Sequence, residues 1–143
     1  MKQTALKRGT KPLRKTSSQK KAVAKRAAWT NFSLFIRNRD PFCITCGDIT
    51  TQAGHFIHNV SNTKLHFDER NVHGQCTRCN MYLSGNLAPY TLFMEDTYGR
   101  TLVDRFLYLK NHRDELNEDK PNEKWYNEIR TKYRDLNAVR NIS

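Results

Sequence analysis

Four cysteines, arranged as two Cys-x-x-Cys pairs, are the residues of this chain whose types and spacing most clearly predict chemistry. Cys43 and Cys46 form the first pair, Cys76 and Cys79 form the second, and residues 47–75 lie between them. Each pair can present two thiolates from one tight turn, and two pairs complete a tetrahedral zinc site. We therefore predict a zinc ion bound by all four cysteines.

A disulfide framework and a redox-active pair are the competing interpretations of these cysteines. A disulfide framework fits neither the spacing nor a reducing compartment, and redox chemistry requires only one of the two pairs. A closed four-cysteine zinc site has no open coordination position, so the zinc is expected to be structural. It would supply folding free energy on the order of 10 kcal/mol, and catalytic groups must lie elsewhere.

Four histidines fall within the segment between the two cysteine pairs. The four are His55, His58, His66 and His73, and Asp68 and Glu69 lie in the same segment. Any one of them alone is most simply a surface residue or a core histidine with its hydrogen bonds made. As a cluster beside a zinc site, they favour a second metal site that catalyses hydrolysis.

Three segments of this region carry a family resemblance. They read Ala53-Gly54-His55-Phe56, then Asn71-Val72-His73-Gly74-Gln75-Cys76 with Cys79-Asn80, and finally Tyr82-Leu83-Ser84-Gly85-Asn86. Together they resemble the NinG/Rap family of phage recombination nucleases. That family is similar to HNH (ββα-metal) endonucleases, including Holliday-junction enzymes of the endonuclease VII type. The resemblance covers roughly residues 20–112 and is most specific across 53–86.

The resemblance implies a fold and an activity. The fold is α+β, with a small zinc-stapled ββα-metal (HNH-like) core flanked by N-terminal and C-terminal helices. The activity is that of a structure-selective, metal-dependent endonuclease. It would hydrolyse phosphodiester bonds in branched DNA, such as Holliday junctions and D-loops, during phage recombination.

The resemblance also assigns roles to single residues. His55, at the end of the first strand of the ββα unit, is the expected general base, because a neutral imidazole can take a proton from water near pH 7. Asn71 matches an asparagine that pins a loop by hydrogen bonds. Asn80, directly after the last cysteine, matches a ligand of the catalytic Mg²⁺ or Mn²⁺, for which an amide oxygen is suitably hard.

The chain departs from the HNH pattern at Gly54, where these enzymes commonly place an Asp or His as a second metal ligand. A glycine has no side chain, so another residue must supply that ligand. His73 is the first candidate, because it lies three residues before the second cysteine pair, and Asp68 and His58 come next. His66 has no motif position and is expected at the surface.

Apolar spacing predicts helices on both sides of the cysteine-rich segment. An N-terminal helix over 18–40, capped by Ser17 or Ser18, is indicated by a stripe of Ala24, Ala28, Phe32 and Phe35, with Trp29, Phe32 and Ile36 as a core face. Asp40-Pro41 is expected to stop this helix, because the residue before a proline is pushed out of the helical region. Residues 41–86 form the zinc/ββα core, and C-terminal helices occupy 87–143. Within that last region we predict helices over 89–98, 101–112 and 122–139, with an acidic linker over 117–122. The core face of the last helix is expected to comprise Trp125, Ile129, Tyr133 and Leu136.

The excess positive charge lies in the first quarter of the chain. The formal net charge is +11, and residues 1–39 hold twelve Lys or Arg and no acid. A near-neutral body with a basic arm is typical of a nucleic-acid-binding protein, with a merely solvated tail as the alternative. We predict a disordered basic arm over 1–16 and a single domain over 17–143. The expected DNA-binding residues are Lys7, Arg8, Lys11, Arg14, Lys15, Lys20, Lys21, Lys25 and Arg26.

Composition bounds the remaining possibilities. Hydrophobic residues make up 37% of the 143 residues, enough for one modest core. No segment approaches the roughly 18 apolar residues of a membrane span, and no apolar segment follows the basic N-terminus, so we expect a cytoplasmic protein (in the host cell if phage-encoded). A junction resolvase must cut two strands, which favours a homodimer.

Two other functions stay open. The first is a non-catalytic zinc-ribbon module that binds nucleic acid through the arm, and the second is a non-specific HNH nuclease. His55 and Asn80 around a zinc knuckle favour an enzyme, because a binding ribbon needs neither residue.

Overall fold

The computed structural model describes residue 9 and residues 11–141. The helices are α1 (Ser17–Arg39), α2 (Leu87–Tyr98), α3 (Arg100–Asn111), α4 (Arg113–Glu118) and α5 (Glu123–Arg140). Two strands, β1 (Gln52–His55) and β2 (Val72–Gln75), and two short helical segments, η1 (Lys64–Phe67) and η2 (Arg78–Tyr82), lie between α1 and α2. The mixed α+β class is therefore confirmed.

The helical part of the expected ββα unit differs from the expectation. The chain leaves β2, passes through Cys76 and forms η2, a π-helical segment of five residues rather than a long α-helix. A turn over Ser84, Gly85 and Asn86 follows, in which all three residues have positive φ, and α2 begins after it. A ββα core of the HNH type is thus not established by the secondary structure alone.

Helix α1 begins at a capping box that the sequence expectation missed. The Thr16 side chain accepts a hydrogen bond from the Gln19 amide at 3.2 Å, and the Gln19 side chain accepts one from the Thr16 amide at 2.8 Å. Thr16 rather than Ser17 or Ser18 is therefore the N-cap, because only Thr16 satisfies the backbone donors of the first turn. The helix ends at Arg39, before Asp40 and Pro41, as predicted.

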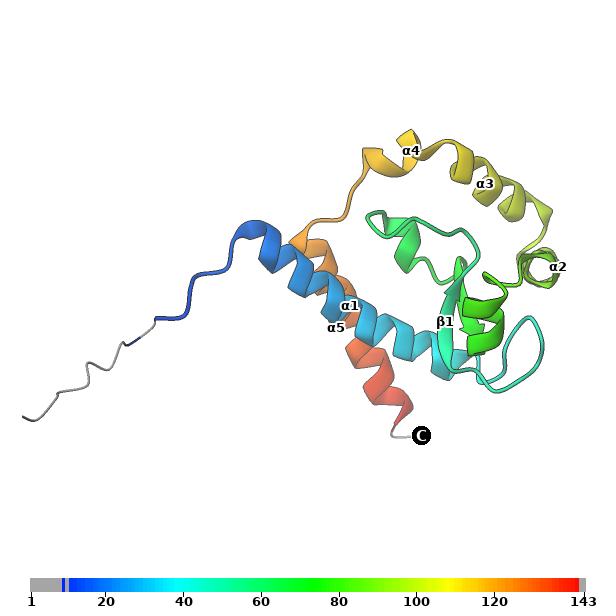
Figure 1. The fold of residues 1–143 in the computed structure, drawn as a ribbon, viewed down its shortest axis with the longest axis horizontal. Coiled ribbons are helices and arrows are strands. Elements are labelled where there is room, and N and C mark those ends of the chain that lie inside the picture. The colour runs from blue at the N-terminus through cyan, green and yellow to red at the C-terminus, as the bar shows by residue number, and fades with distance from the viewer. Residues whose placement is uncertain (1–8, 10, 142–143) are drawn as a thin grey trace, which may run out of the picture.

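Helices α1 and α5 lie side by side and form one core with the sheet (Figure 1). On α1 the buried residues are Ala24, Ala28, Phe32 and Ile36, whereas Trp29 and Phe35 are partly buried. On α5 the expected face is rotated: Tyr126, Tyr133 and Asn137 are buried, while Leu136 is 39% exposed. The observed face of α5 makes a polar contact in addition to its apolar ones, because the Asn137 side chain donates to the Asn31 carbonyl at 2.9 Å.

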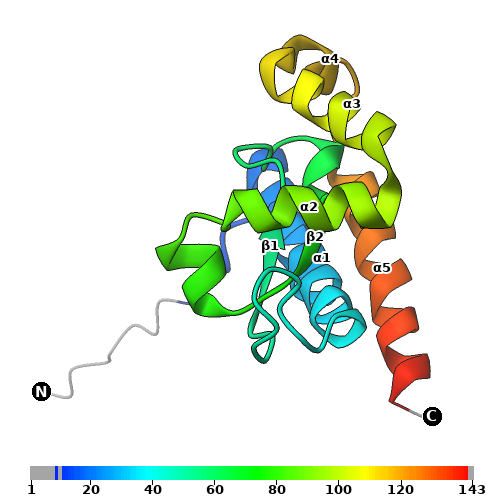
Figure 2. The same ribbon diagram turned by 90° about the vertical axis from the view of Figure 1, so that its right-hand side faces the viewer.

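The two strands form an antiparallel hairpin that lies between α1 and α2, as Figure 2 shows. The register pairs Gln52 with Gln75 and Gly54 with His73. On the α2 side, the Tyr90 hydroxyl donates to the Gly54 carbonyl at 2.9 Å. A second core cluster joins the segment after β1 to α2 and α3, and it comprises Phe56, Ile57, Val60, Leu65, Tyr90, Met94, Val103, Phe106 and Leu109.

The region after α3 is more helical than expected. Helix α4 includes Asn117 and Glu118, so the predicted linker is reduced to the few residues before Asn122, which caps α5. Among the described residues, no helix combines the length and the apolar character needed to cross a membrane.

Candidate functional site

The four cysteines converge as their spacing predicts. Their sulfur atoms all lie within 4.8 Å of one another, and the Sγ atoms of Cys46 and Cys76 are 3.6 Å apart. A zinc ion about 2.3 Å from each sulfur of a tetrahedral site would hold the sulfurs about 3.8 Å apart. The cluster could therefore hold a metal such as zinc, and no disulfide links the four residues.

Local backbone structure presents these sulfurs. The Gly47 amide donates to the Cys43 carbonyl at 2.8 Å, closing the first turn, and Gly47 has a φ of 84° that favours glycine. The Ile44 amide donates to the Gly74 carbonyl at 3.0 Å and so fixes this turn to β2. The turn of the first cysteine pair is thus hydrogen-bonded to β2, and the second pair begins directly after β2.

A pocket of about 330 Å³ lies beside the hairpin and collects three of the four histidines. Its lining residues are Ala53, His55, His58, Asn59, Val60, Ser61, His66 and Asn80. Polar side chains from β1, from the segment after β1, from η1 and from η2 therefore meet at one place. This pocket is the candidate active site.

His66 belongs to this site rather than to the open surface where it was expected. Its ring stacks on the His55 ring with centroids 4.4 Å apart and lies 4.7 Å from the Trp29 ring. Burial, followed by the nearby His55 and Lys25, lowers the pKa of His66 to about 3. His66 has no motif position in the sequence, because its place depends on how η1 folds back onto α1.

The protonation state of His55 follows from its hydrogen bond. Its Nε2 lies 3.0 Å from the carbonyl oxygen of His66, and a carbonyl can only accept, so Nε2 carries the proton. Nδ1 is then left with a lone pair. Burial lowers the pKa of His55 to about 4, despite the opposing effect of the carbonyl. The ring is therefore neutral near pH 7 and able to accept a proton at Nδ1.

Asn80 presents an amide oxygen near Gly54. Its Nδ2 donates to Gln52 Oε1 at 2.7 Å, which fixes the orientation of the amide. Its Oδ1 accepts no hydrogen bond from the described part of the chain, and a Cβ at Gly54 would lie 2.9 Å from it. This free amide oxygen is available to a hard cation.

The structure does not bring His73 to the pocket, so its expected role as the second metal ligand is corrected. Its side chain is 1% exposed, and both ring nitrogens contact tyrosine hydroxyls, of Tyr90 at 2.8 Å and of Tyr98 at 2.7 Å. Burial, followed by the charge of Arg39, lowers the pKa of His73 to about 3. His73 is thus a neutral core residue that links β2 to α2.

Asn71 and Asp68 also lie outside the pocket lining. The buried Asn71 side chain accepts from the Ile57 amide at 2.7 Å and donates to the Ile57 and Leu65 carbonyls, which are the hydrogen bonds of a loop pin. Asp68 pairs with Arg70 at 2.8 Å. Asn71 therefore shapes the wall of the site without reaching into it, and Asp68 is engaged elsewhere.

Part of the predicted basic surface lies next to the pocket. A shallow hollow on α1 is lined by Lys25, Arg26, Trp29 and also by His66, which it shares with the pocket. Lys11, Arg14, Lys15, Lys20 and Lys21 are exposed. Lys7 and Arg8 lie outside the described residues.

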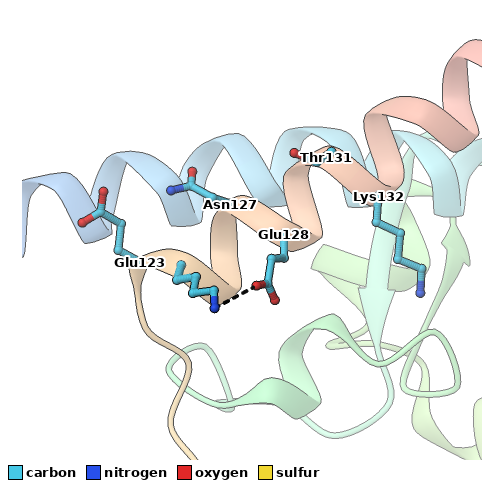
Figure 3. A pocket seen from close by; sticks show the side chains of 6 residues that line it. Glu123, Asn127, Glu128, Thr131 and Lys132 are labelled. Atoms are coloured by element: carbon cyan, nitrogen blue, oxygen red, sulfur yellow. Dashed lines mark ion pairs between the residues drawn. The ribbon is translucent and has the colours of Figure 1, made fainter.

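A larger hollow on the described surface has no such convergence of groups. It lies on one face of α5 and has a volume of about 770 Å³ (Figure 3). Its lining residues all belong to that helix, and among them Lys124 and Glu128 pair at 3.9 Å. The face of a single helix brings together no groups from different elements and so offers no catalytic arrangement.

Comparison with known proteins decides the family of this chain. The sequence model described as "Bacteriophage Lambda NinG protein" matches residues 1–140. The chain belongs to the NinG family. NinG proteins of Salmonella phage P22 and Escherichia phage lambda are 38% and 37% identical to it over 100 residues, which make up 63% of this chain and 49% of either relative. The NinG protein of Enterobacteria phage H19B is 42% identical over 71 residues, or 48% of this chain and 35% of that protein.

This NinG chain thus aligns with about half the length of the curated relatives it matches. No solved structure shows a significant match to it. The family name describes no reaction, and the chemistry of this NinG protein has to be inferred from its pocket.

Proposed function

We propose that this NinG protein is a metal-dependent endonuclease that hydrolyses phosphodiester bonds in branched DNA. One observation carries the proposal. The same pocket holds a neutral His55 with a free Nδ1 and an Asn80 side chain with a free amide oxygen. A base and a hard cation ligand in one cavity suit hydrolysis of a phosphodiester. The four-cysteine cluster beside them would serve as scaffold.

His55 is the group that would activate water. Its Nε2 is held by the His66 carbonyl, and its ring contacts the rings of both His66 and Trp29, with centroids 4.4 Å and 5.3 Å away. The ring therefore keeps one orientation, with Nδ1 as the proton acceptor. Fixing the tautomer and the plane of the base lowers the cost of reaching a reactive geometry.

The donor atoms present fit a hard divalent cation. Asn80 offers an amide oxygen, and Mg²⁺ and Mn²⁺ prefer oxygen ligands to sulfur. Such an ion, when bound, neutralises the scissile phosphate and stabilises the leaving oxygen. Gln52 would support it by holding the Asn80 amide with its oxygen toward Gly54.

The basic N-terminal region would bind the DNA backbone. Lys25 and Arg26 line the hollow next to the pocket, and α1 carries no acidic residue in its first turn. Phosphate contacts of this kind fix the position of DNA without reading its sequence. Selectivity for junctions, action in the host cytoplasm during phage recombination and a homodimer that cuts two strands are further parts of this proposal, and they stem from the resemblance to Holliday-junction nucleases.

The test is cleavage of a labelled four-way junction beside a linear duplex of matched sequence, with Mg²⁺ or Mn²⁺ and with EDTA as control. We expect metal-dependent cleavage that favours the junction. Equal cleavage of both substrates would indicate a non-specific nuclease. Binding of both without cleavage under any metal condition would refute the nuclease and leave a non-catalytic DNA-binding module.

A further inference from the structure

Trp29 is a large aromatic side chain that the fold leaves partly open. It lies at the edge of the buried stripe of α1 and is itself only partly buried. Its ring packs against the buried Phe67 ring, with centroids 5.9 Å apart, and it also lines the hollow on α1, which has a volume of about 640 Å³. A ring that the core holds in place at the surface is a platform on which another flat ring can stack.

The hollow around Trp29 is basic. Its lining residues on α1 are Gln19, Ala22, Lys25, Arg26, Trp29 and Thr30. None of them is acidic, and α1 as a whole contains no Asp or Glu. The Lys25 ammonium donates to Asn62 Oδ1 at 3.1 Å, which restrains its position. An aromatic ring beside cations is the combination that binds single-stranded nucleic acid, because the cations contact phosphates while the ring stacks on a base.

The hollow is continuous with the candidate active site through His66, which lines both. The centroid of the His66 ring is 4.7 Å from that of Trp29 and 4.4 Å from that of His55. The Trp29 and His55 rings are themselves 5.3 Å apart. A nucleotide whose base occupies the hollow is therefore a near neighbour of the bond that would be cut.

We propose that the hollow receives one unpaired base of the DNA, which stacks on Trp29 while Lys25 and Arg26 bind the adjoining phosphates. The inference rests on the proposed nuclease function for the substrate, and it adds how branched DNA is recognised. Within a duplex both faces of a base are covered by its neighbours, so a base has to leave its stack to reach Trp29. This step costs least for a base that is already single-stranded, as in the displaced strand of a D-loop. Every base has a π face, so the hollow selects unpaired DNA without selecting a sequence.

DNA binding in EDTA tests the hollow, because no strand is cut under that condition. The probes are two fluorescein-labelled duplexes of one sequence, the first with a single unpaired thymine and the second with an abasic residue in its place. We expect the wild-type chain to bind the thymine probe about 5–150-fold more tightly, the usual effect of stacking one base on an aromatic side chain. Trp29→Leu should bind both probes alike, whereas Trp29→Phe, which keeps an aromatic ring, should retain part of the preference.

The other tryptophan of the chain provides the matched control. Trp125 lies on α5, and its ring contacts Phe67 and Tyr126. Trp125→Phe should therefore keep the wild-type preference for the thymine probe. In this variant all tryptophan fluorescence comes from Trp29, since the chain contains two Trp. The thymine probe should quench that fluorescence, and the abasic probe should leave it nearly unchanged.

Equal affinity of the wild-type chain for the two probes, or an unchanged preference in Trp29→Leu, would overturn the proposal and leave an apolar peptide as the better occupant of the hollow. If Trp29→Leu does not fold, as judged by circular dichroism, the quenching of Trp29 decides, because it is measured with the hollow intact. Neither readout requires cleavage. Base-dependent binding by a chain that cuts no DNA would uphold the hollow and refute the nuclease, whereas cleavage of branched DNA with base-independent binding would do the reverse.

Discussion

At the scale of single residues, the site contains two kinds of side chain. Some are fully hydrogen-bonded and support the fold, and others keep an atom available for the proposed reaction. Asn71 and His73 are buried and fully engaged in hydrogen bonds between the strands, the loop and α2. Within the part of the chain that the structure describes, His55 has one nitrogen engaged and one free, and Asn80 has its amide nitrogen engaged and its oxygen free. Free atoms on otherwise fixed side chains are what a reaction needs, since they are held in place and still able to bind.

Replacement of the proposed base tests this division. His55→Ala should reduce cleavage of branched DNA by about 10²–10⁴-fold, because it removes the proposed proton acceptor. Fold, metal content of the cysteine cluster and DNA affinity should stay close to wild type, as measured by circular dichroism, elemental analysis and a binding titration. Asn80→Ala should also lose cleavage but recover in part at high Mn²⁺, because it weakens an ion site and removes no proton acceptor. A fully active His55→Ala protein would end the assignment of the base.

The buried His73 predicts how stability depends on pH. Its pKa is about 3 in the folded protein and about 6.5 when unfolded, so between these values the unfolded chain binds more protons. Stability contributed by the neutral ring is therefore complete above pH 6.5 and falls as the pH decreases, by up to about 1.4 kcal/mol per pH unit. The groups around it are Arg39, which lowers its pKa, and Asp40 and Asp68, which raise it.

His73→Gln should remove this slope. We expect the variant to be less stable than wild type at pH 7.5, because it loses contacts with two tyrosine hydroxyls. The difference should shrink toward pH 5, measured by urea unfolding at each pH. A parallel pH dependence of the two proteins would show that His73 is not buried in its neutral form.

At the scale of elements, the hairpin takes its position from what holds its ends. The first cysteine turn is tied to β2, and the second cysteine pair follows β2 directly. With strands of four residues each, the hairpin has few backbone hydrogen bonds of its own. Isolated two-stranded hairpins are marginal, so cross-linking through the cysteines is expected to stabilise it.

Removing one sulfur should therefore unfold the centre of the molecule. We expect Cys43→Ser or Cys79→Ser to lose cooperative unfolding and bound zinc together, because an incomplete site loses most of the metal-binding free energy. Elemental analysis of the wild type should give one tightly bound zinc per chain. A folded and active preparation without zinc would refute this role.

Helix α5 is fixed to the core by polar contacts in addition to its apolar face. The Tyr133 hydroxyl donates to Glu69 Oε1 at 2.7 Å, linking α5 to the segment before β2. Tyr133→Phe should lower the free energy of unfolding by about 1.5–3 kcal/mol, the usual contribution of a hydrogen bond to a charged group. Tyr82→Phe, at a side chain that is largely exposed, is the matched control and should change it little. Urea titrations of the three proteins give the comparison, and equal losses would contradict this role of the hydroxyl.

At the scale of the whole molecule, charge and chemistry are divided between two regions that α1 joins. The twelve basic residues of 1–39 precede a body in which Lys or Arg and Asp or Glu nearly balance. Lys25 and Arg26 bring this charge to the hollow beside the pocket. A DNA backbone bound along α1 would therefore pass close to His55 and His66.

Deletion of residues 1–15 should reduce the salt dependence of DNA binding. It removes Lys2, Lys7, Arg8, Lys11, Arg14 and Lys15 but keeps Thr16, whose capping box α1 needs. If about half of these side chains contact phosphates, the slope of log affinity against log salt should fall by roughly 2–3, at about 0.9 per contact. Stability should be unchanged, and deletion of Thr16 as well should lower it by about 1 kcal/mol. An unchanged slope would mean that the arm does not bind DNA.

The sequence by itself determined the elements whose cause is local. The two cysteine pairs predicted a common cluster, because the turn that presents each pair is set by a few adjacent residues. The apolar spacing of α1 predicted its buried stripe, and Asp40-Pro41 predicted its end, since both depend on neighbours within a few positions. The proposed roles of His55 and Asn80 came from a motif and are still to be tested, although the structure does place both in one pocket.

Only the tertiary structure decided which of the other polar residues reach the site. Spacing ranked His73 ahead of Asp68 and His58 as the second metal ligand, but a ligand's place depends on how β2, η1 and α2 pack around the hairpin. Because α2 packs against the sheet, His73 lies in the core, in contact with Tyr90. Because η1 packs against α1, His66 lies beside His55. Contacts between residues far apart in the chain carry no local pattern, and these contacts define the site.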